Sequence, residues 1–278
     1  MGDARVSVIV PVRNGGPLLT RCLDALAAQQ GAPAYEVIVV DNGSTDGSAQ
    51  FAREHPARPT VVTEPRRGSY AARNAGAATA TGEVLACTDV DCVPMPGWLA
   101  RGVAAVASAD LVGGRITATA ATNPVGRYDA ALYLDQEEFV AQQGFAATAN
   151  LFVRTDVFRD LHGFDATLRS GGDVEFCQRA TRAGHLLAYA ADAVVRHDPR
   201  TSYRELWRLH RRLGAGWHDL AARGLRPAAR HDPALRWPTF GSAVDRVNLT
   251  SPSLRRRQVA GPHAVAMTAR WVGRLTGR

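Results

Sequence analysis

The chain of 278 residues contains no lysine, so arginine supplies all 33 of its basic residues. It also has no apolar run of the roughly 18 residues that can span a bilayer, and we therefore expect no membrane-spanning helix. The first residues, MGDARVSVIVPV, include an acid and lead directly into an apolar segment, which argues against a secretory signal. The four cysteines lie in apolar segments without metal-binding spacing, which indicates reduced packing residues in a cytoplasmic protein. They are Cys22, Cys87, Cys92 and Cys177.

Acidic residues are nearly missing from the last part of the chain. Residues 1–199 hold 17 Arg and 22 acids, a balance of −5, whereas residues 200–278 hold 16 Arg and 4 acids, a balance of +12. A biased genome composition explains the use of arginine alone, but it does not explain this asymmetry. We therefore predict a folded part over residues 1–200 and a basic helical extension over residues 201–278 with a role of its own.

Strand-like and helix-like segments alternate through the first two hundred residues. Val6–Val12 is a continuous β-branched run, typical of a strand buried on both faces. Further strands are predicted at Glu36–Asp41, Thr60–Glu64, Glu83–Asp89, Leu111–Thr117, Ala146–Val153 and Leu187–His197. Helices are predicted at Pro17–Gln30, Asp46–His55, Ser69–Thr79, Pro96–Ser108, Pro124–Gly144, Thr155–Leu161 and Asp173–Ala183. This alternation predicts an α/β fold with a mostly parallel, doubly wound sheet and helices on both faces.

Polar residues follow several of the predicted strands. They are Arg13-Asn14, Asp41-Asn42 and the pair Asp89 and Asp91. In such sheets ligands bind outside the carboxyl ends of the strands. Two carboxylates two residues apart point the same way in an extended backbone, and a hard divalent cation such as Mn²⁺ or Mg²⁺ is held by one or two carboxylates together with substrate phosphates. The sequence therefore predicts a divalent-cation and phosphate site at this edge.

A second acidic pair, Asp173 and Glu175, follows the glycine-containing stretch Ser170-Gly171-Gly172. Acids in a first helical turn are favoured by the helix dipole, so capping is one interpretation of the pair. The other interpretation is a catalytic carboxylate, with the glycines allowing a substrate to approach the backbone closely.

Six segments, in this order, resemble the nucleotide-sugar-dependent glycosyltransferases of family 2, which have the GT-A fold. They are SVIVPVRN (7–14), VVDNGSTDGS (39–48), RNAG (73–76), ATGEVLACTDVDCVP (80–94), GGDVEF (171–176) and VVRH (194–197). The resemblance covers about residues 5–200, and implies a nucleotide-binding part over about 1–117 and an acceptor-binding part over about 118–200. The absence of a Gly-x-Gly-x-x-Gly or Walker sequence disfavours dinucleotide and P-loop folds.

The resemblance implies a role for each matching residue. The nucleoside pocket would be lined by Pro11, Val12, Arg13, Asn14 and Asn42, with Asp41 accepting a hydrogen bond from the base and Arg73 beside it. Asp91 would bind the metal, Asp89 the ribose or metal-bound water, and His197 the metal or the diphosphate. The metal would neutralise the leaving diphosphate.

The resemblance also implies direct displacement with inversion at the anomeric carbon, with Asp173 as the general base. Many members of the family have an acid where this chain has Gly172, so Glu175 stays a candidate beside the favoured Asp173. The implied donor is a UDP-sugar, and the implied acceptor is a small molecule, a glycan or a lipid phosphate. The motif of processive polysaccharide synthases is missing, which favours transfer of a single sugar. Two alternatives stay open: a nucleotidyltransferase of related fold and a non-catalytic membrane-docking protein.

The basic extension contains two segments with apolar residues at helical spacing, Tyr203–Gly224 and Val259–Leu275. Docking against the rest of the protein explains such a stripe. An interfacial helix on an anionic membrane or a lipid-phosphate acceptor also explains it. No nucleic-acid-reading motif accompanies the charge, so we expect no nucleic-acid partner.

Overall fold

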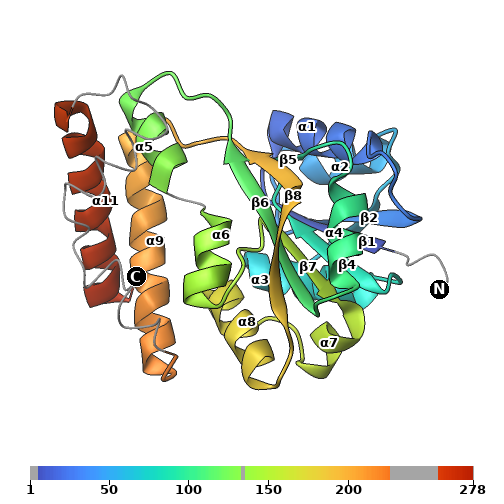
Figure 1. Ribbon diagram of the computed structural model, residues 1–278. Helices are drawn as coiled ribbons and strands as arrows, with labels where there is room; N and C mark the ends of the chain where they lie inside the picture. The colour runs from blue at the N-terminus through green and yellow to red at the C-terminus, as the bar shows by residue number, and fades with distance from the viewer. Residues whose placement is uncertain (1–5, 133–134, 226–255, 278) are drawn as a thin grey trace. The chain divides into compact units, whose positions relative to one another are not determined.

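The computed structural model describes residues 6–132, 135–225 and 256–277 (Figure 1). The arginine- and proline-rich sequence that begins at Arg226 lies outside the described residues as far as Arg255. The chain forms two compact units. Unit 1 comprises Met1–Ile116, Gln136–Thr167 and Gly172–His197, and unit 2 comprises Thr117–Asp135, Leu168–Gly171 and Asp198–Arg278.

The elements alternate largely as the sequence predicts. The strands are β1 (Val6–Val12), β2 (Tyr35–Asp41), β3 (Thr60–Thr63), β4 (Val84–Thr88), β5 (Cys92–Pro94), β6 (Leu111–Ala118), β7 (Asn150–Arg154) and β8 (Leu187–His197). The helices are α1 (Gly16–Ala27), α2 (Ser48–Glu54), α3 (Ser69–Thr79), α4 (Trp98–Val106), α5 (Pro124–Leu132), α6 (Gln136–Glu138), the π-helix η1 (Phe139–Gln143), α7 (Thr155–Asp160), α8 (Gly172–Arg182), α9 (Tyr203–Ala222) and α11 (Arg256–Thr276).

The strands form one sheet in the order β3-β2-β1-β4-β7-β6-β8-β5. The run β3-β2-β1-β4 is parallel. In contrast, β7 pairs antiparallel with β4 and β6, and β5 pairs antiparallel with β8. The sequence did not indicate these reversals, because a fully buried apolar strand has the same pattern in either direction.

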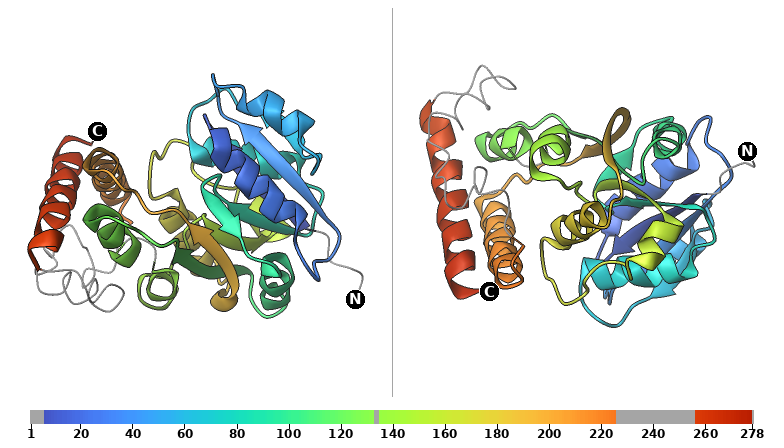
Figure 2. Two further views of the ribbon diagram at one scale, coloured as in Figure 1. Left: turned by 90° about the horizontal axis from the view of Figure 1, so that it is seen from above. Right: turned by 60° about the horizontal axis from the view of Figure 1, so that its bottom comes forward.

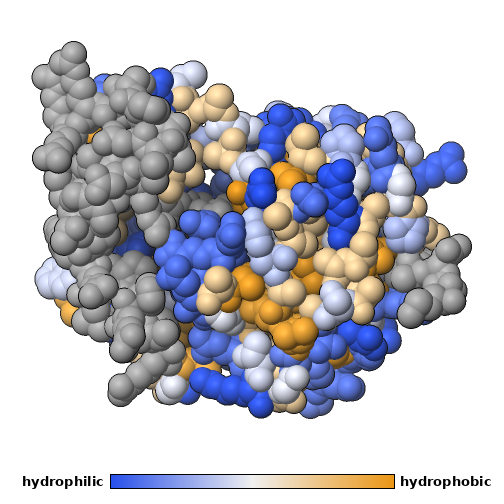
Figure 3. All heavy atoms as spheres, viewed as in Figure 1, coloured by the Kyte–Doolittle hydropathy of each residue, from blue (hydrophilic) through white to orange (hydrophobic). Residues whose placement is uncertain are grey.

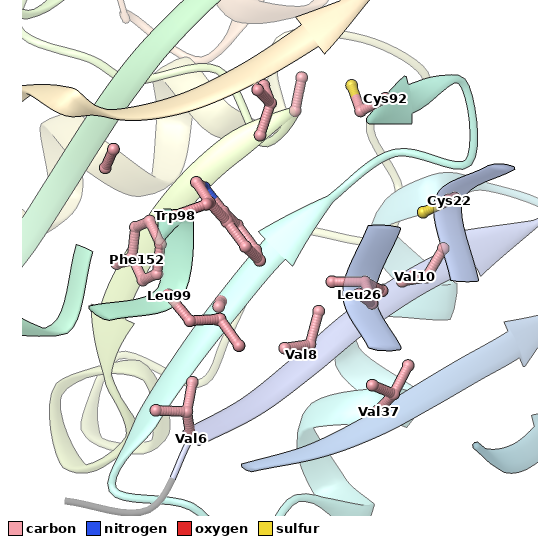
Figure 4. Close-up of a cluster of buried hydrophobic side chains, with 14 of the residues drawn as sticks. Val6, Val8, Val10, Cys22, Leu26, Val37, Cys92, Trp98, Leu99 and Phe152 are labelled. Carbon is pink, nitrogen blue, oxygen red and sulfur yellow. The ribbon is translucent and has the colours of Figure 1, made fainter. Parts of the chain in front are cut away.

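Alternating residues of β1 cover the two faces of the sheet. Val6, Val8 and Val10 point into a buried cluster with residues of α1 and α4, including Leu26 and Trp98 (Figure 4). Figure 2 shows the strands and helices of the chain from two further directions. Ile9 points to the opposite face, where a Cβ on Gly76 of α3 would lie only 2.7 Å from its Cγ2 atom. Helices therefore cover both faces, as predicted. On the side that bears α4 and β8, hydrophilic side chains are interspersed with apolar ones at the surface (Figure 3).

The prediction of one continuous helix over Pro124–Gly144 is wrong. The segment contains three separate helices, α5, α6 and η1. The buried Gln136 explains the second piece: its amide accepts a hydrogen bond from the N–H of Ala147 at 2.9 Å and donates to the carbonyl of Asn150 at 2.9 Å. These bonds satisfy the backbone before β7, and the strand consequently begins at Asn150 instead of Ala146. Local polar contacts, rather than apolar periodicity, set this region.

Unit 2 contains helices α5, α9 and α11. Val125 and Tyr128 of α5 pack against Leu206 of α9 and Met267 of α11 in a small apolar core. Ser202 begins α9 with a capping box that includes Glu205. None of the described helices is long and apolar enough to cross a membrane.

Two glycines bring the backbones of α9 and α11 close together. A Cβ on Gly214 would lie 2.1 Å from the backbone oxygen of Arg270, and one on Gly273 would lie 2.0 Å from that of Arg211. A methyl group at either position therefore forces backbone apart, which no side-chain rotation can relieve. Helix contact in unit 2 depends on these two positions.

We predict that Gly214→Ala lowers the free energy of unfolding by about 1–3 kcal/mol, the usual cost of overpacking. The gain in helix propensity, about 1 kcal/mol, offsets only part of a backbone collision. Urea unfolding measured by circular dichroism checks the effect. Thr268→Ala, at an exposed position of α11, is the control and should change stability by no more than about 0.5 kcal/mol. Unchanged or higher stability of Gly214→Ala would contradict this close packing.

Candidate active site

The loops after β1 and β2 hold each other in place. Asn14 has a left-handed backbone (φ 56°), and its Oδ1 atom accepts a hydrogen bond from the N–H of Thr45 at 2.8 Å. Arg13 is exposed beside it, and Pro11 is half-buried. The side chain of Val12 lies in the apolar core, so any contact of Val12 with a nucleotide would involve its backbone.

Asp41 and Asn42, at the end of β2, are both buried. Asp41 accepts a hydrogen bond from the N–H of Ser44 through Oδ1 at 3.1 Å. Asn42 donates to the carbonyls of Glu64 and Arg66 at 2.8 and 2.7 Å. It also accepts from the N–H of Gly68 at 2.8 Å. Asn42 therefore shapes the loop that leads into α3, and Asp41 provides a buried carboxylate at the end of β2.

The two acids of the Asp-x-Asp triplet have different partners. Strand β4 ends at Thr88, and the chain turns at Val90 and Asp91 before β5. The expectation of an extended backbone with parallel carboxylates is therefore wrong. Asp89 forms an ion pair with Arg73 of α3, which is only 2% exposed.

Asp91 instead faces His197. The antiparallel register of β5 and β8 places His197 opposite Cys92, the residue after Asp91. The Nε2 atom of His197 lies 3.3 Å from Oδ2 of Asp91. One carboxylate oxygen and one imidazole nitrogen at this separation fit the coordination shell of a divalent cation that takes its other ligands from phosphates and water. Among the described residues no group of three acid, histidine or cysteine side chains could hold a metal.

Two buried cysteines, Cys22 and Cys92, lie near the Asp-x-Asp triplet but are not suited to bind a metal. Burial, together with the charges of Asp91 and Asp89, raises the pKa of Cys22 to about 12. Burial also raises the pKa of Cys92. Both therefore stay protonated near neutral pH, and thiols in that form are poor metal ligands. All four cysteines are free and buried, which confirms that they are packing residues.

The two acids of α8 also have different surroundings. Glu175 forms a two-pronged ion pair with Arg179, with bonds of 2.7 and 2.9 Å, and Arg179 also donates to the carbonyl of Gly163 at 2.7 Å. Asp173 accepts a hydrogen bond from the hydroxyl of Tyr70 at 3.3 Å. Desolvation raises the pKa of Asp173. Glu175 is thus held in a structural contact with Arg179, whereas Asp173 is the less constrained carboxylate.

Tyr70 is the residue that the sequence reading missed. It lies three positions before Arg73 on α3, so the two side chains share one helix face. One reaches Asp173 and the other reaches Asp89. The sequence does contain one indication of Tyr70: it lies one helical turn before Arg73, which begins the RNAG motif. A side chain on that helix face can reach the acids of the two other motifs, Asp89 and Asp173.

Comparison with known proteins agrees with this arrangement. The sequence model of the family described as glycosyl transferase family 2 matches residues 7–162. The chain is 39% identical over 220 residues to the glycosyltransferase AglE of Haloferax volcanii, covering 76% of this chain and 72% of that protein. It is 35% identical over 212 residues to the pre-mycofactocin glycosyltransferase of Mycobacterium tuberculosis, covering 72% of this chain and 44% of that protein. The chain therefore belongs to glycosyl transferase family 2.

Solved structures share the fold. A mannosyltransferase of Pyrobaculum calidifontis, in complex with GDP-Man and Mn²⁺, matches 97% of this chain and 85% of its own with a TM-score of 0.65 and 22% identity. S. aureus TarS 1–349 in complex with UDP-GlcNAc matches 98% of this chain and 91% of its own with a TM-score of 0.58 and 17% identity. The predicted GT-A fold is confirmed, and so is the class of enzyme: a nucleotide-sugar glycosyltransferase. This class disfavours both alternatives, nucleotidyl transfer and a non-catalytic role.

We predict that Glu175→Gln lowers the free energy of unfolding by about 2 kcal/mol, the usual worth of hydrogen bonds to a charged group, because Arg179 loses its charged partner. Urea unfolding measures this loss. The pH dependence of turnover should keep its shape. Full stability combined with a lost acid limb would instead identify Glu175 as the base.

Proposed function

We propose that the protein is a metal-dependent, inverting glycosyltransferase that moves one sugar from a UDP-sugar to an acceptor hydroxyl. The observation that carries this proposal is the contrast on α8. Asp173 has a raised pKa and accepts a hydrogen bond from the hydroxyl of Tyr70, whereas its neighbouring acid, Glu175, is held in an ion pair by Arg179. Such a carboxylate is suited to take a proton from an acceptor near neutral pH.

Donor binding would use the end of the parallel strands. Asp41 would accept a hydrogen bond from a ring N–H of the base, and Arg13 and Asn14 would line the nucleoside. The base and the sugar are separate questions, since one solved neighbour holds GDP-Man and another holds UDP-GlcNAc. Uracil and guanine both offer a ring N–H to a carboxylate, so UDP and GDP should both be tested as ligands.

Asp91 and His197 would hold Mn²⁺ or Mg²⁺. When bound, a divalent ion would stabilise the negative charge of the departing diphosphate as a Lewis acid. Asp89, ion-paired with Arg73, would contact the ribose or metal-bound water. The fit rests on the 3.3 Å separation of the two ligating groups and on the hard character of the carboxylate.

In the transfer step, the acceptor oxygen attacks the anomeric carbon from the face opposite the diphosphate. The acceptor proton passes to the carboxylate of Asp173 as the new carbon–oxygen bond forms. The bond between the anomeric carbon and the diphosphate oxygen breaks, and its electron pair leaves with the nucleoside diphosphate. A single displacement of this kind inverts the configuration at that carbon.

The acceptor would be a small molecule, a glycan or a lipid phosphate, and contact with an anionic membrane would bring a lipid acceptor to the enzyme. Supporting this, Trp271 and Leu275 are 61% and 62% exposed on α11, four residues apart. Residues four apart share a helix face, and apolar and tryptophan side chains on an arginine-rich helix suit a membrane interface.

Asp91→Asn should weaken Mn²⁺ binding in the presence of UDP by on the order of 100-fold, since ligand sets lose about that much when one member or its support is removed. Calorimetric titration measures it, with GDP and UDP tested side by side. Asp110→Asn is the matched control, because Asp110 forms another aspartate–histidine contact, at 3.5 Å from His185. Wild-type Mn²⁺ affinity in Asp91→Asn would exclude the metal assignment.

Asp173→Asn should lower turnover by about 10²–10⁴-fold, the usual contribution of a general base, and leave the affinity for the nucleoside diphosphate unchanged. In the wild type, turnover should rise with pH through the raised pKa of Asp173, because the base acts only when deprotonated. Steady-state kinetics with a UDP-sugar and water or a hydroxylated acceptor tests both points. Glu175→Gln serves as the control, and equal losses in the two variants would contradict the assignment.

A further inference from the structure

Tyr70 links α3 to the proposed base. Its side chain is buried, with 6% exposed, and its hydroxyl donates to Oδ1 of Asp173 at 3.3 Å. This distance is long for a hydroxyl donor, as catalytic hydrogen bonds often are before substrate is bound. The ring of Tyr70 packs on Phe164, with centroids 5.5 Å apart, so its position is set by packing as well as by the bond.

The absence of a side chain at Gly172 makes room for that ring. A Cβ on Gly172 would lie 2.7–2.8 Å from the Cε2, Cδ2 and Cζ atoms of Tyr70. Gly172 is not among the glycines with a left-handed backbone, so its backbone could accommodate alanine. The constraint against a side chain at this position therefore comes from the Tyr70 ring and not from the conformation of α8.

The direction of the hydrogen bond follows from the ionisation of the two groups. Burial and the charge of Asp173 raise the pKa of Tyr70, so the phenol stays protonated and donates. The N–H of Val174 also donates to Oδ1 of Asp173, at 3.0 Å. Both bonds therefore fall on the Oδ1 atom of the carboxylate, and Oδ2 receives neither of them.

We propose that Tyr70 is a positioning residue for the transfer reaction: it orients Asp173 through its hydroxyl, and Gly172 provides the space that this contact needs. The inference rests on the proposed role of Asp173 as the base. Burial raises the pKa of Asp173, and the N–H of Val174, the positive charge of Arg73 and the Tyr70 hydroxyl all act against this effect. A hydrogen bond to a carboxylate favours its charged form, so Tyr70 contributes to keeping Asp173 deprotonated together with those two groups.

Tyr70→Phe keeps the ring and removes the hydroxyl. It should move the acid limb of the kcat–pH profile up by about 0.5–1 pH unit, which lowers kcat about three- to tenfold at pH values on that limb, and leave both the plateau of kcat and the KM for the donor unchanged. Tyr128→Phe is the matched control: Tyr128 is also buried, and its hydroxyl contacts Nδ1 of His263 at 3.1 Å in unit 2. That variant should leave the profile in place.

Gly172→Ala provides a second, independent route to the same defect, because the new methyl group must displace the ring. It should shift the acid limb in the same direction, and the double variant should be no worse than the more affected single variant, since both changes disturb the same contacts of the Tyr70 hydroxyl with Asp173 and with the backbone at the start of α8. Additive losses, or a loss in Tyr70→Phe that is equal at every pH, would show a merely structural role and overturn the proposal.

The carboxyl ¹³C titration of Asp173, assigned by comparison with Asp173→Asn, measures the contact without any turnover. A higher pKa in Tyr70→Phe supports the proposal, and an unchanged pKa overturns it. If Asp173→Asn keeps full activity, the proposed function fails instead. The titration then reports separately whether Tyr70 controls this carboxyl group.

Discussion

The buried guanidinium of Arg73 joins α3 to the end of β4 in unit 1. It is 2% exposed, and its partner is Asp89. A buried charge without a partner costs several kcal/mol, so α3 and the end of β4 must stay in register. Gly76, one turn further along α3, lets the helix approach β1 and β2 closely, and this approach brings Arg73 to Asp89. The same helix face carries Tyr70 to Asp173. A single packed helix therefore positions both acids.

Much of this fold could be predicted from the sequence. The run Val6–Val12 and the segment Leu187–His197 are strands with the predicted bounds, and Ser69–Thr79 is the predicted helix. In these segments the apolar period and the local residue preferences agree. The direction of β7 could not be predicted, since its neighbours in the sheet are far away in the chain. The break between α5 and α6 was missed because the contacts of Gln136 are polar and not periodic.

The candidate site was predictable as a set of residues and less so as a set of contacts. The motifs led to Asp41, Asp89, Asp91, Asp173 and His197, and the structure pairs the last of these with Asp91. No motif pointed to Tyr70, because a buried tyrosine on a helix is ordinary core. The resemblance favours Asp173 over Glu175, and the structure adds one contact to that proposal: Arg179, four residues beyond Glu175 on the same helix, forms an ion pair with Glu175. Contacts between residues far apart in the sequence depend on the whole fold, and short sequence motifs do not specify them.

Two acidic triplets of this chain have the same spacing: Asp89-Val90-Asp91 and Asp173-Val174-Glu175. In each of them one acid pairs with an arginine and the other does not, although the backbone differs between the two. In a helix, residues two apart do not face each other, so α8 presents Asp173 to α3 and Glu175 to Arg179. In a strand they would share a face, but the turn at Val90 and Asp91 removes that condition. Each triplet thus has one acid in an ion pair with a buried or half-buried arginine. The other acid of each triplet contacts a side chain other than arginine: Asp91 lies against His197, and Asp173 lies against Tyr70. The arginine-paired acids hold the framework, and the acids with weaker partners are those whose charge a cation or a proton can take up, which is the property that metal binding and general-base chemistry both require.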